Sequence, residues 1–511
     1  MRLQGVMQPL KDNMKFKSIT EKISEKTFPI NIYGISESGK SYIINGIFEE
    51  NSMVIVTHSD VDAKNLYEDL SFYTTDVFYF PVREVVFYNV DAISGDLRWA
   101  RLKVIKEILQ NERKKIIVTS IDSLTSLYTP KEYYLRYSMI IKTGDNVDLK
   151  EISKSLLQCG YERVEVVEGK GEFSFRGGIL DVFPPTSAYP YRVELFGDEV
   201  DSIRTFNTES QRSIEKVKEF SIFPSKEVIV DDEGRNRAVQ TINEELKNIV
   251  ANVSNLNKES VEKIKGIVGK NIELLNNTYY FETIDSYLPF FYEKLDSFFD
   301  YLDGYTFIVD DFKRSLGKMD SIYYEFNENY ISFLQRGDIL PLQNNLLLNK
   351  GELESKLENS SLITLSSFLN KSDNLFNTVD IGFEEITLNK YNGQLNLLIE
   401  DIEERKEKKY KTVILAGTRP RGERLVKTLM EKGISSTYKD SIDKIEAGEV
   451  VITFGNLIRG FDYPELELSI ISDKDIFGET RRKHSGKAVK RKGVAKITSF
   501  AELKPGDYVV H

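Results

Sequence analysis

A glycine-rich stretch near the start of the chain has residue types and spacing that suit phosphate binding. The strand-like run FPINIYG ends at Gly34, and the sequence then fits the pattern G-x-x-x-x-G-K-S, with its later positions at Gly39, Lys40 and Ser41. Backbone N–H groups of such a loop close on phosphate oxygens, the lysine reaches the terminal phosphates and the serine holds Mg²⁺. The loop therefore predicts a site for ATP and Mg²⁺. The alternative is a chance match or a relic of such a loop.

The elements around this loop must place it between a strand and a helix. Apolar runs typical of buried strands occupy residues 54–57, 77–80 and 116–119, and helical stripes lie between them. Strands that alternate with helices predict a mostly parallel sheet with crossover helices. The same alternation returns after residue 391, so the sequence predicts two α/β units.

A second candidate site lies within residues 169–206, where two strand-like runs, GILDVF and YRVELF, follow each other. In the second run, alternate residues beginning at Tyr191 are apolar and predict the core face. The other face carries Arg192, Glu194 and Phe196. An aromatic side chain beside an arginine on a solvent face is typical of an interface hot spot. The plainer alternative is a single exposed phenylalanine on a small sheet, which is common.

The same residues carry a family resemblance. The string GEF-x-x-RGGI-x-D-x-FPP, followed by PYR-x-E-x-FGDE-x-DSIR, resembles the UvrA-binding domain that UvrB shares with the transcription-repair coupling factors. In that family the surface that meets UvrA includes an arginine before the double glycine, the arginine of PYR and the phenylalanine four residues on. The resemblance implies these roles for Arg176, Arg192 and Phe196.

The resemblance covers essentially all 511 residues and implies a multidomain α/β chain. Its parts are a UvrB-like RecA-type α/β domain, a small α+β UvrA-binding domain inserted into it, and a second, degenerate RecA-like α/β domain. The predicted boundaries are 1–137 for the first part of the α/β domain with its phosphate loop, 138–224 for the UvrA-binding domain, 225–345 for a helical part and the return to the first α/β domain, 346–390 for a linker, 391–479 for the second α/β domain, and 480–511 for a basic linker and the start of an RNA-polymerase-interacting domain.

The resemblance also bears on whether the loop belongs to a working ATPase. It puts Asp310 and Asp311 at the position of the acidic pair that holds Mg²⁺ and activates water in motor proteins. Asp311 is one methylene shorter than the usual glutamate, so it would hold a water poorly as a general base. A working second lobe would also carry a Q-x-x-GR-x-x-R motif, which does not follow Gly478. We therefore expect no catalytic residue, with two solvated acids as the alternative.

Two further positions where motor and repair proteins carry functional residues depart from those patterns. Arg419 and Arg421 stand at a predicted helix start, which is not the place of the arginine motif. UvrB carries, within the region matching residues 80–102, a long tyrosine-rich hairpin that clamps damaged DNA, and the segment here has no room for it. The resemblance is therefore to the coupling factors rather than to UvrB.

Composition limits the class of protein. The net charge of −11 means that the chain as a whole does not hold DNA by bulk charge. One cysteine, Cys159, excludes an internal disulfide and a cysteine-cluster metal site, and 3 histidines are too few for a histidine metal centre. No apolar run approaches the ~18 residues of a membrane helix, and the start lacks the apolar core of a signal peptide. We expect a cytoplasmic protein with no membrane contact.

The last residues suggest continuation beyond the sequence. Arg481–Lys496 holds eight lysines or arginines and no acid, so it reads as a flexible linker or, alternatively, as a contact to phosphate backbones. The ending FAELKPGDYVVH resembles the opening of the RNA-polymerase-interacting domain of the coupling factors. We expect the chain to be the N-terminal part of a longer protein.

The function implied by the resemblance is transcription-coupled nucleotide excision repair. The chain would recruit UvrA to RNA polymerase stalled at DNA lesions, and the full protein would displace the polymerase by ATP-driven translocation on DNA. The alternative is a UvrB-like protein that binds or hydrolyses ATP during damage verification. The intact loop favours this alternative, whereas the shortened acid and the missing arginine motif disfavour it.

Overall fold

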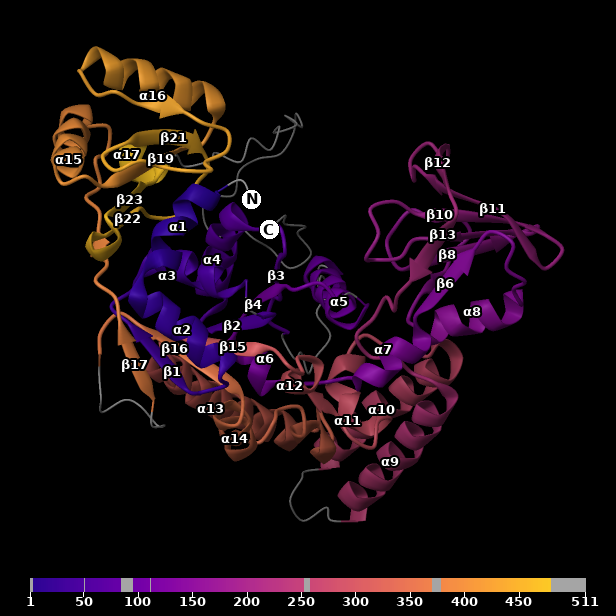
Figure 1. Cartoon of the computed structure of the whole chain (residues 1–511). Helices are drawn as coiled ribbons and strands as arrows, with labels where there is room; N and C mark the ends of the chain where they lie inside the picture. Colours follow the sequence, from indigo (N-terminus) through magenta and orange to yellow (C-terminus); the bar gives the residue numbers. More distant parts are fainter. Residues whose placement is uncertain are drawn as a thin grey trace, which may run out of the picture.

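The computed structural model describes residues 3–49, 51–83, 95–110, 112–251, 258–369 and 378–478. Figure 1 shows a central α/β body with an inserted domain on one side and a second α/β unit on another. Three predicted features lie outside the described residues: residues 84–94 of the stretch compared with the UvrB hairpin, the basic segment 481–496, and the expected start of a polymerase-interacting domain.

A seven-stranded sheet forms the centre of the first α/β unit, in the order β17-β1-β16-β15-β2-β4-β3. Every neighbouring pair is parallel, which confirms the predicted parallel sheet. The strands are β1 (Ile30–Tyr33), β2 (Met53–Thr57), β3 (Val77–Tyr79), β4 (Ile116–Ser120), β15 (Thr306–Asp310), β16 (Ser361–Ser366) and β17 (Val379–Gly382).

Helices bury both faces of this sheet, because successive side chains of a strand point to opposite sides. On β2, Met53 and Ile55 enter one apolar cluster, whereas Val54 and Val56 enter another. The first cluster contains side chains of α1 (Gln4–Asp12), α2 (Met14–Ser24), α3 (Glu37–Ile47) and α4 (Asp60–Tyr73). The second contains side chains of α5 (Gly95–Gln110), α6 (Ile121–Thr125), α7 (Lys131–Tyr137), α12 (Phe298–Tyr301), α13 (Phe312–Gln335) and α14 (Lys350–Glu358).

The interpretation of residues 346–390 as a linker is wrong. This segment contains α14, β16 and β17, and β16 pairs with both β1 and β15 in the interior of the first sheet. Its apolar residues Leu362, Ile363 and Leu365 are fully buried. The serine- and asparagine-rich composition around the strands hid the short apolar run that the sheet requires.

The inserted domain contains a six-stranded sheet in the order β12-β11-β10-β9-β8-β7, with α8 beside it. A separate pair, β6 and β13, joins the domain to the body, and Met139 lies opposite Ile222 in this pair. The chain therefore enters and leaves the domain side by side. The elements are β6 (Met139–Lys142), α8 (Leu149–Gln158), β7 (Glu162–Arg163), β8 (Glu172–Arg176), β9 (Ile179–Val182), β10 (Tyr191–Phe196), β11 (Glu199–Phe206), β12 (Ser213–Val217) and β13 (Glu219–Ile222).

A helical layer follows the inserted domain, as the sequence predicted. Its apolar side chains form one cluster of their own. It consists of α9 (Asp232–Ala251), α10 (Lys258–Thr278), η2 (Ile284–Tyr287), α11 (Leu288–Phe291) and η3 (Pro341–Asn344), with the short pair β5 (Leu127–Tyr128) and β14 (Asp296–Ser297) at its edge. A buried ion pair ties the body to the end of the inserted domain, since Arg101 Nε and Nη2 lie 2.8 and 2.7 Å from the two carboxylate oxygens of Glu227.

The second α/β unit has a six-stranded sheet in the order β18-β22-β23-β19-β21-β20. Its inner strands contribute Val413, Val451 and Ile470 to the same apolar cluster that fills one face of the first unit. The two units therefore share a continuous core. The elements are β18 (Ile386–Thr387), α15 (Leu395–Glu407), β19 (Lys411–Ala416), α16 (Arg419–Glu431), β20 (Thr437–Tyr438), β21 (Val450–Phe454), β22 (Phe461–Tyr463), η4 (Pro464–Leu466), β23 (Leu468–Ile471) and α17 (Asp473–Phe477).

Candidate functional sites

The first candidate site is the polar face of the inserted sheet. Strand pairing places Asp181 opposite Arg192 and Arg192 opposite Arg204, and directly opposed residues share a face. The opposite face is apolar, with Val193 buried and Tyr191 packed against the same cluster. The alternation predicted for this strand is therefore present.

Arg192 on this face is held by the domain itself. Its Nε and Nη2 donate to Asp181 Oδ1 and Oδ2 at 2.7 and 2.8 Å, and its guanidinium carbon lies 4.5 Å from the centroid of the Phe206 ring. Nη2 also donates to the side-chain oxygen of Gln211 at 3.1 Å. The hydrogen bonds to Asp181 raise the pKa of Arg192 above its usual value. The side chain of Arg192 is only 20% exposed, so most of its donors are committed before any partner arrives.

Arg176 and Phe196 lie at the other, open end of the same sheet. Phe196 is 84% exposed, and Ile179 beside them is 37% exposed. Arg176 lies directly opposite Ile179, and the N–H of Leu195 donates to the carbonyl oxygen of Gly178 at 2.8 Å. Two hairpin turns thus meet at one edge and present an aromatic, an aliphatic and a cationic side chain together.

The second candidate site is the predicted phosphate loop, which connects β1 to α3. Gly34 has a φ of +75°, and a Cβ added there would lie 1.9 Å from the carbonyl oxygen of Phe383. Backbone conformation and space therefore both require glycine at this position. The helix begins at Glu37, so Lys40 and Ser41 lie in its first two turns.

A carboxyl group of the protein lies in the mouth of this loop. Ser36 donates its backbone N–H to Glu385 Oε2 at 2.7 Å and its hydroxyl to Oε1 at 2.9 Å. The Tyr463 hydroxyl lies 3.2 Å from Oε2 and 3.1 Å from the carbonyl oxygen of Gly39. Burial raises the pKa of Glu385 to about 7, although the Ser36 donors and the charge of Lys40 act in the other direction. No sequence pattern indicated Glu385, which is separated from Ser36 by 349 positions.

The side chains expected to hold phosphate and Mg²⁺ are also committed to protein partners. Lys40 Nζ lies 2.6 Å from Asp310 Oδ1, and the two side chains are 15% and 12% exposed. The buried Ser41 hydroxyl donates to the carbonyl oxygen of Ser38 at 2.6 Å. The structure thus brings together Lys40 and Asp310 as an ion pair, and their predicted role in nucleotide binding stays a prediction.

ATP with Mg²⁺ does not fit these side chains as they are arranged. The Ser36 N–H, the Lys40 ammonium and the Ser41 hydroxyl each already have a partner within the protein. The carboxyl group of Glu385 already accepts the two Ser36 donors that a phosphate group would need. The nucleotide-binding role predicted for the loop and the acidic pair therefore stays a prediction that these contacts do not support.

Asp311 serves as a helix cap. It follows β15 with a φ of +45°, and its Oδ1 accepts the backbone N–H of Arg314 at 3.3 Å at the start of α13. Asp311→Ala is expected to lower the free energy of unfolding by about 1–2 kcal/mol, because the cap is lost and alanine is strained at positive φ. Asparagine also caps helices and tolerates this conformation, so Asp311→Asn should lower the free energy of unfolding by only a few tenths of that amount. Urea unfolding of both variants checks this, and equal losses would contradict the capping role.

Two residues that sequence reasoning missed connect the loop to the second α/β unit. Ser38 donates its hydroxyl to Asp69 Oδ2 at 2.6 Å, and Asp69 Oδ1 accepts the backbone N–H of Ile458 at 2.8 Å. The backbone N–H of Arg459 donates to Ser38 Oγ at 3.0 Å. Burial raises the pKa of Asp69 to about 6. No local pattern could have indicated these contacts, because Ser38 and Asp69 are 31 positions apart and their partners Arg459 and Ile458 lie about 400 positions further along the chain.

Arg419 and Arg421 of the second unit are paired with acids of the same unit. Arg421 Nη1 lies 2.5 Å from Asp473 Oδ2, and Arg419 Nε lies 3.0 Å from Glu423 Oε1. Within the described ranges, no group of three or more histidine, cysteine, aspartate or glutamate side chains could hold a metal ion. Among the helices of the same ranges, none combines the length and the apolar composition that crossing a bilayer requires.

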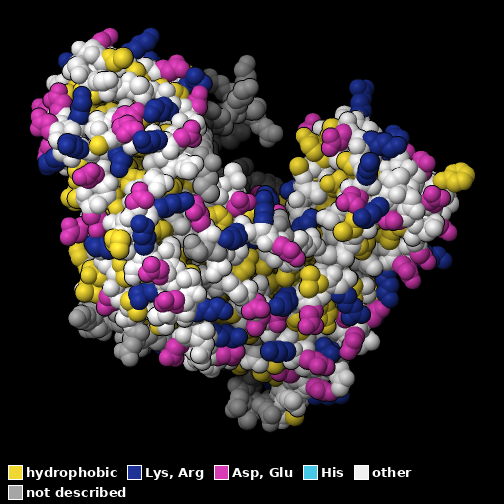
Figure 2. Space-filling model, viewed as in Figure 1, with side chains coloured by type: hydrophobic (Ala, Val, Ile, Leu, Met, Phe, Trp, Pro, Cys, Tyr) yellow, Lys and Arg dark blue, Asp and Glu magenta, His cyan; other side chains and the backbone are white. Residues whose placement is uncertain are grey.

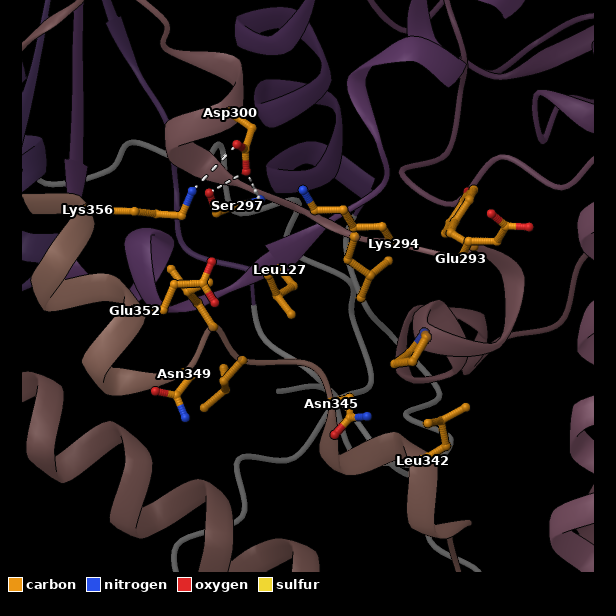
Figure 3. Close-up of a pocket in the computed structure, with 15 residues that line it drawn as sticks. Leu127, Glu293, Lys294, Ser297, Asp300, Leu342, Asn345, Asn349, Glu352 and Lys356 are labelled. Carbon is orange, nitrogen blue, oxygen red and sulfur yellow. Dashed lines mark hydrogen bonds and ion pairs between the residues drawn. The ribbon is translucent and has the colours of Figure 1, made fainter. Parts of the chain in front are cut away.

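A pocket between α12, α14 and η3 lies away from both candidate sites (Figure 3). Three of the polar side chains that line it contact one another. Asp300 accepts the N–H and hydroxyl of Ser297 at 2.7 and 2.6 Å, and it pairs with Lys356 at 3.6 Å. These contacts cap α12 and give Ser297, Asp300 and Lys356 partners within the protein.

Comparison with known proteins agrees with the architecture. The family model described as "UvrB interaction domain" matches residues 139–228, which include all strands of the inserted domain. The chain is 30% identical over 519 residues to the transcription-repair-coupling factor of Bacillus subtilis (strain 168), covering 100% of this chain and 43% of that protein. It is 26% identical to the transcription-repair-coupling factors of Staphylococcus epidermidis, over 509 residues, and of Staphylococcus aureus (strain MRSA252), over 486 residues.

The matches cover nearly all of this chain but less than half of each relative. The match to the S. epidermidis protein covers 98% of this chain and 42% of that protein, and the match to the S. aureus protein covers 94% and 41%. The chain thus spans about two fifths of the length of the curated relatives that it matches. Residues 139–228 thus match the model of the UvrB interaction domain, and the whole chain is similar to a part of the transcription-repair-coupling factors.

Proposed function

We propose that this chain binds UvrA through the open end of the inserted sheet, with Phe196 and Arg176 as the principal contacts. The exposure of Phe196 at 84%, on a strand whose other face is buried, is the observation that carries the proposal. An exposed aromatic ring gains free energy when a partner covers it, and a neighbouring arginine adds directional hydrogen bonds. Arg192 supports this surface by fixing the sheet, and its remaining donors contribute less.

The wider role follows from the family. We propose that the chain is part of a longer protein that brings UvrA to RNA polymerase stalled at DNA lesions. ATP-driven translocation on DNA belongs, in this proposal, to parts of the family proteins beyond the length matched here. On the face that Figure 2 shows, cationic and anionic side chains are interspersed, so this face does not offer DNA a continuous cationic surface. A cytoplasmic location fits this role.

The rival enzyme function receives little support. A UvrB-like ATPase would need a free lysine, a free serine and an open loop. Lys40 and Ser41 instead contact protein groups, and Glu385 lies in the mouth of the loop. The chain is therefore proposed to be a recruiting module rather than an ATP hydrolase.

Titration of purified UvrA against this chain tests the proposal. The wild-type chain is expected to bind, and Arg176→Ala is expected to weaken binding by about 1 kcal/mol, roughly fivefold, because a cation at the rim of an interface is lost. The arginine contribution should shrink as salt is raised from 50 to 300 mM, a range chosen to span about one halving of the screening length. Lys150→Ala, on the exposed side of α8, is the matched control and should bind normally. Failure of the folded wild-type chain to bind UvrA would refute the proposal.

A further inference from the structure

The phosphate loop has every feature of an anion-binding loop, yet a carboxyl group of the same chain fills it. We propose that Glu385 is the resident ligand of this loop and excludes phosphate from it, so that the loop joins the two α/β units instead of binding nucleotide. This inference goes beyond UvrA recruitment and does not depend on it.

The sheet itself carries Glu385 to the loop. β17 pairs in parallel with β1, with Gly382 opposite Tyr33, and the pairing continues past the ends of both strands. The N–H of Phe383 donates to the carbonyl oxygen of Tyr33 at 2.9 Å, and the N–H of Glu385 donates to that of Gly34 at 3.2 Å. By the period of two, Ile381, Phe383 and Glu385 fall on one side of the extended chain. The first two of these side chains are buried, and the third meets the loop.

The loop is fitted to this carboxyl group. A Cβ added to Gly39 would lie only 2.1 Å from Glu385 Oε2, so the second glycine of the motif provides the room that the carboxyl occupies. Ser36 supplies two donors to the two carboxyl oxygens, which is the contact that a loop of this type offers to a phosphate. A carboxyl that merely lay nearby would not need a backbone donor, a hydroxyl donor and a glycine together.

The same contacts hold the second α/β unit in place. Tyr463, on β22, reaches both Glu385 and the carbonyl oxygen of Gly39. Its ring stacks on Tyr42 of α3 with centroids 5.9 Å apart, inside the core that both units share. In a motor protein this junction has to open and close around nucleotide. Here the junction is filled by side chains, which explains why an intact loop motif coexists with lost catalytic residues.

Isothermal titration with pyrophosphate, together with the melting temperature at increasing pyrophosphate, tests this inference on the full chain. The wild-type protein is expected to show no saturable binding up to millimolar concentrations. Glu385→Ala removes the carboxyl and should bind pyrophosphate at least tenfold more tightly than wild type, with a rise in melting temperature. Adding Lys40→Ala to this variant should remove the gain, because the lysine is the cation that the anion would meet.

Two controls separate the loop from general effects. Glu384→Ala removes the neighbouring exposed carboxylate and should leave pyrophosphate binding absent. If Glu385→Ala does not fold, Glu385→Ser carries the test: it keeps a polar group but removes the carboxyl from the loop, and it should raise pyrophosphate affinity above wild type. Tight binding by the wild-type protein, or no gain in whichever of these variants folds, overturns the inference. Binding of UvrA by the same samples is expected to stay normal, so failure here is distinguishable from failure of the recruiting role.

Discussion

Phe196→Ala is expected to weaken binding of UvrA by about 2–3 kcal/mol, roughly 30- to 150-fold in Kd. The ring is 84% exposed in the free chain and lies at the end of a strand that is paired on both sides. Burial of the ring by a partner therefore costs little conformational entropy, because its backbone is already fixed and the ring loses few rotamers. The effect should appear mainly in the dissociation rate, measured by surface plasmon resonance.

The matched control for this change is Ile140→Ala. Ile140 is 60% exposed and lies on β6, in the small sheet that joins the same domain to the body. It is an exposed apolar side chain away from the open end, so its loss should change affinity less than twofold. Equal effects of the two substitutions would show that exposed apolar area in general, rather than the end that carries Phe196, drives binding. Because Phe196 makes few contacts within the chain, the melting temperature of Phe196→Ala should match that of wild type.

Arg192→Ala is expected to lower the free energy of unfolding by about 3 kcal/mol, the lower end of the range for a broken buried ion pair. Asp181 is 3% exposed and would lose both of its hydrogen bonds to the guanidinium. The contact of the guanidinium with the Phe206 ring would be lost as well. Urea unfolding, followed at a signal that reports on the inserted domain, measures the change.

Arg204 offers a control within the same sheet. Its Nη2 lies 3.0 Å from Glu194 Oε2, but the two side chains are 40% and 33% exposed. A pair this exposed is screened by water, so Arg204→Ala should cost well under 1 kcal/mol. If Arg192→Ala costs no more than Arg204→Ala, Arg192 does not have the structural role assigned to it. Weak binding of UvrA by an Arg192→Ala chain of nearly unchanged stability would in that case reflect a direct contact.

Local sequence patterns predicted much of the fold. Runs that are apolar at every position, such as residues 53–56, became strands buried on both faces, and the alternation in YRVELF separated the buried from the polar face of β10. The loop at Gly34 was found because its chemistry depends on neighbours in the sequence. The linker prediction for 346–390 was wrong because a short central strand can be stabilised by its neighbours in the sheet without a strong signal of its own.

The contacts that decide what the candidate sites can do are long-range, and patterns do not contain them. Glu385 reaches Ser36 only because β17 returns to lie beside β1. Likewise, the sequence placed Arg192 and Phe196 on one face but could not show that Asp181 holds the first while the second stays exposed. The sequence patterns therefore indicated candidate site residues, whereas the hydrogen-bond partners of these residues could be identified only from the three-dimensional structure.

The pairing of β6 with β13 has a consequence for how the inserted domain can be inherited. Because Met139 lies opposite Ile222, the domain is attached to its host through two adjacent strands. Because the entry strand and the exit strand lie side by side, the body of the protein does not have to rearrange to accept the inserted domain. A gene segment encoding these residues could therefore be transferred as a cassette between host proteins that have lost or kept other activities.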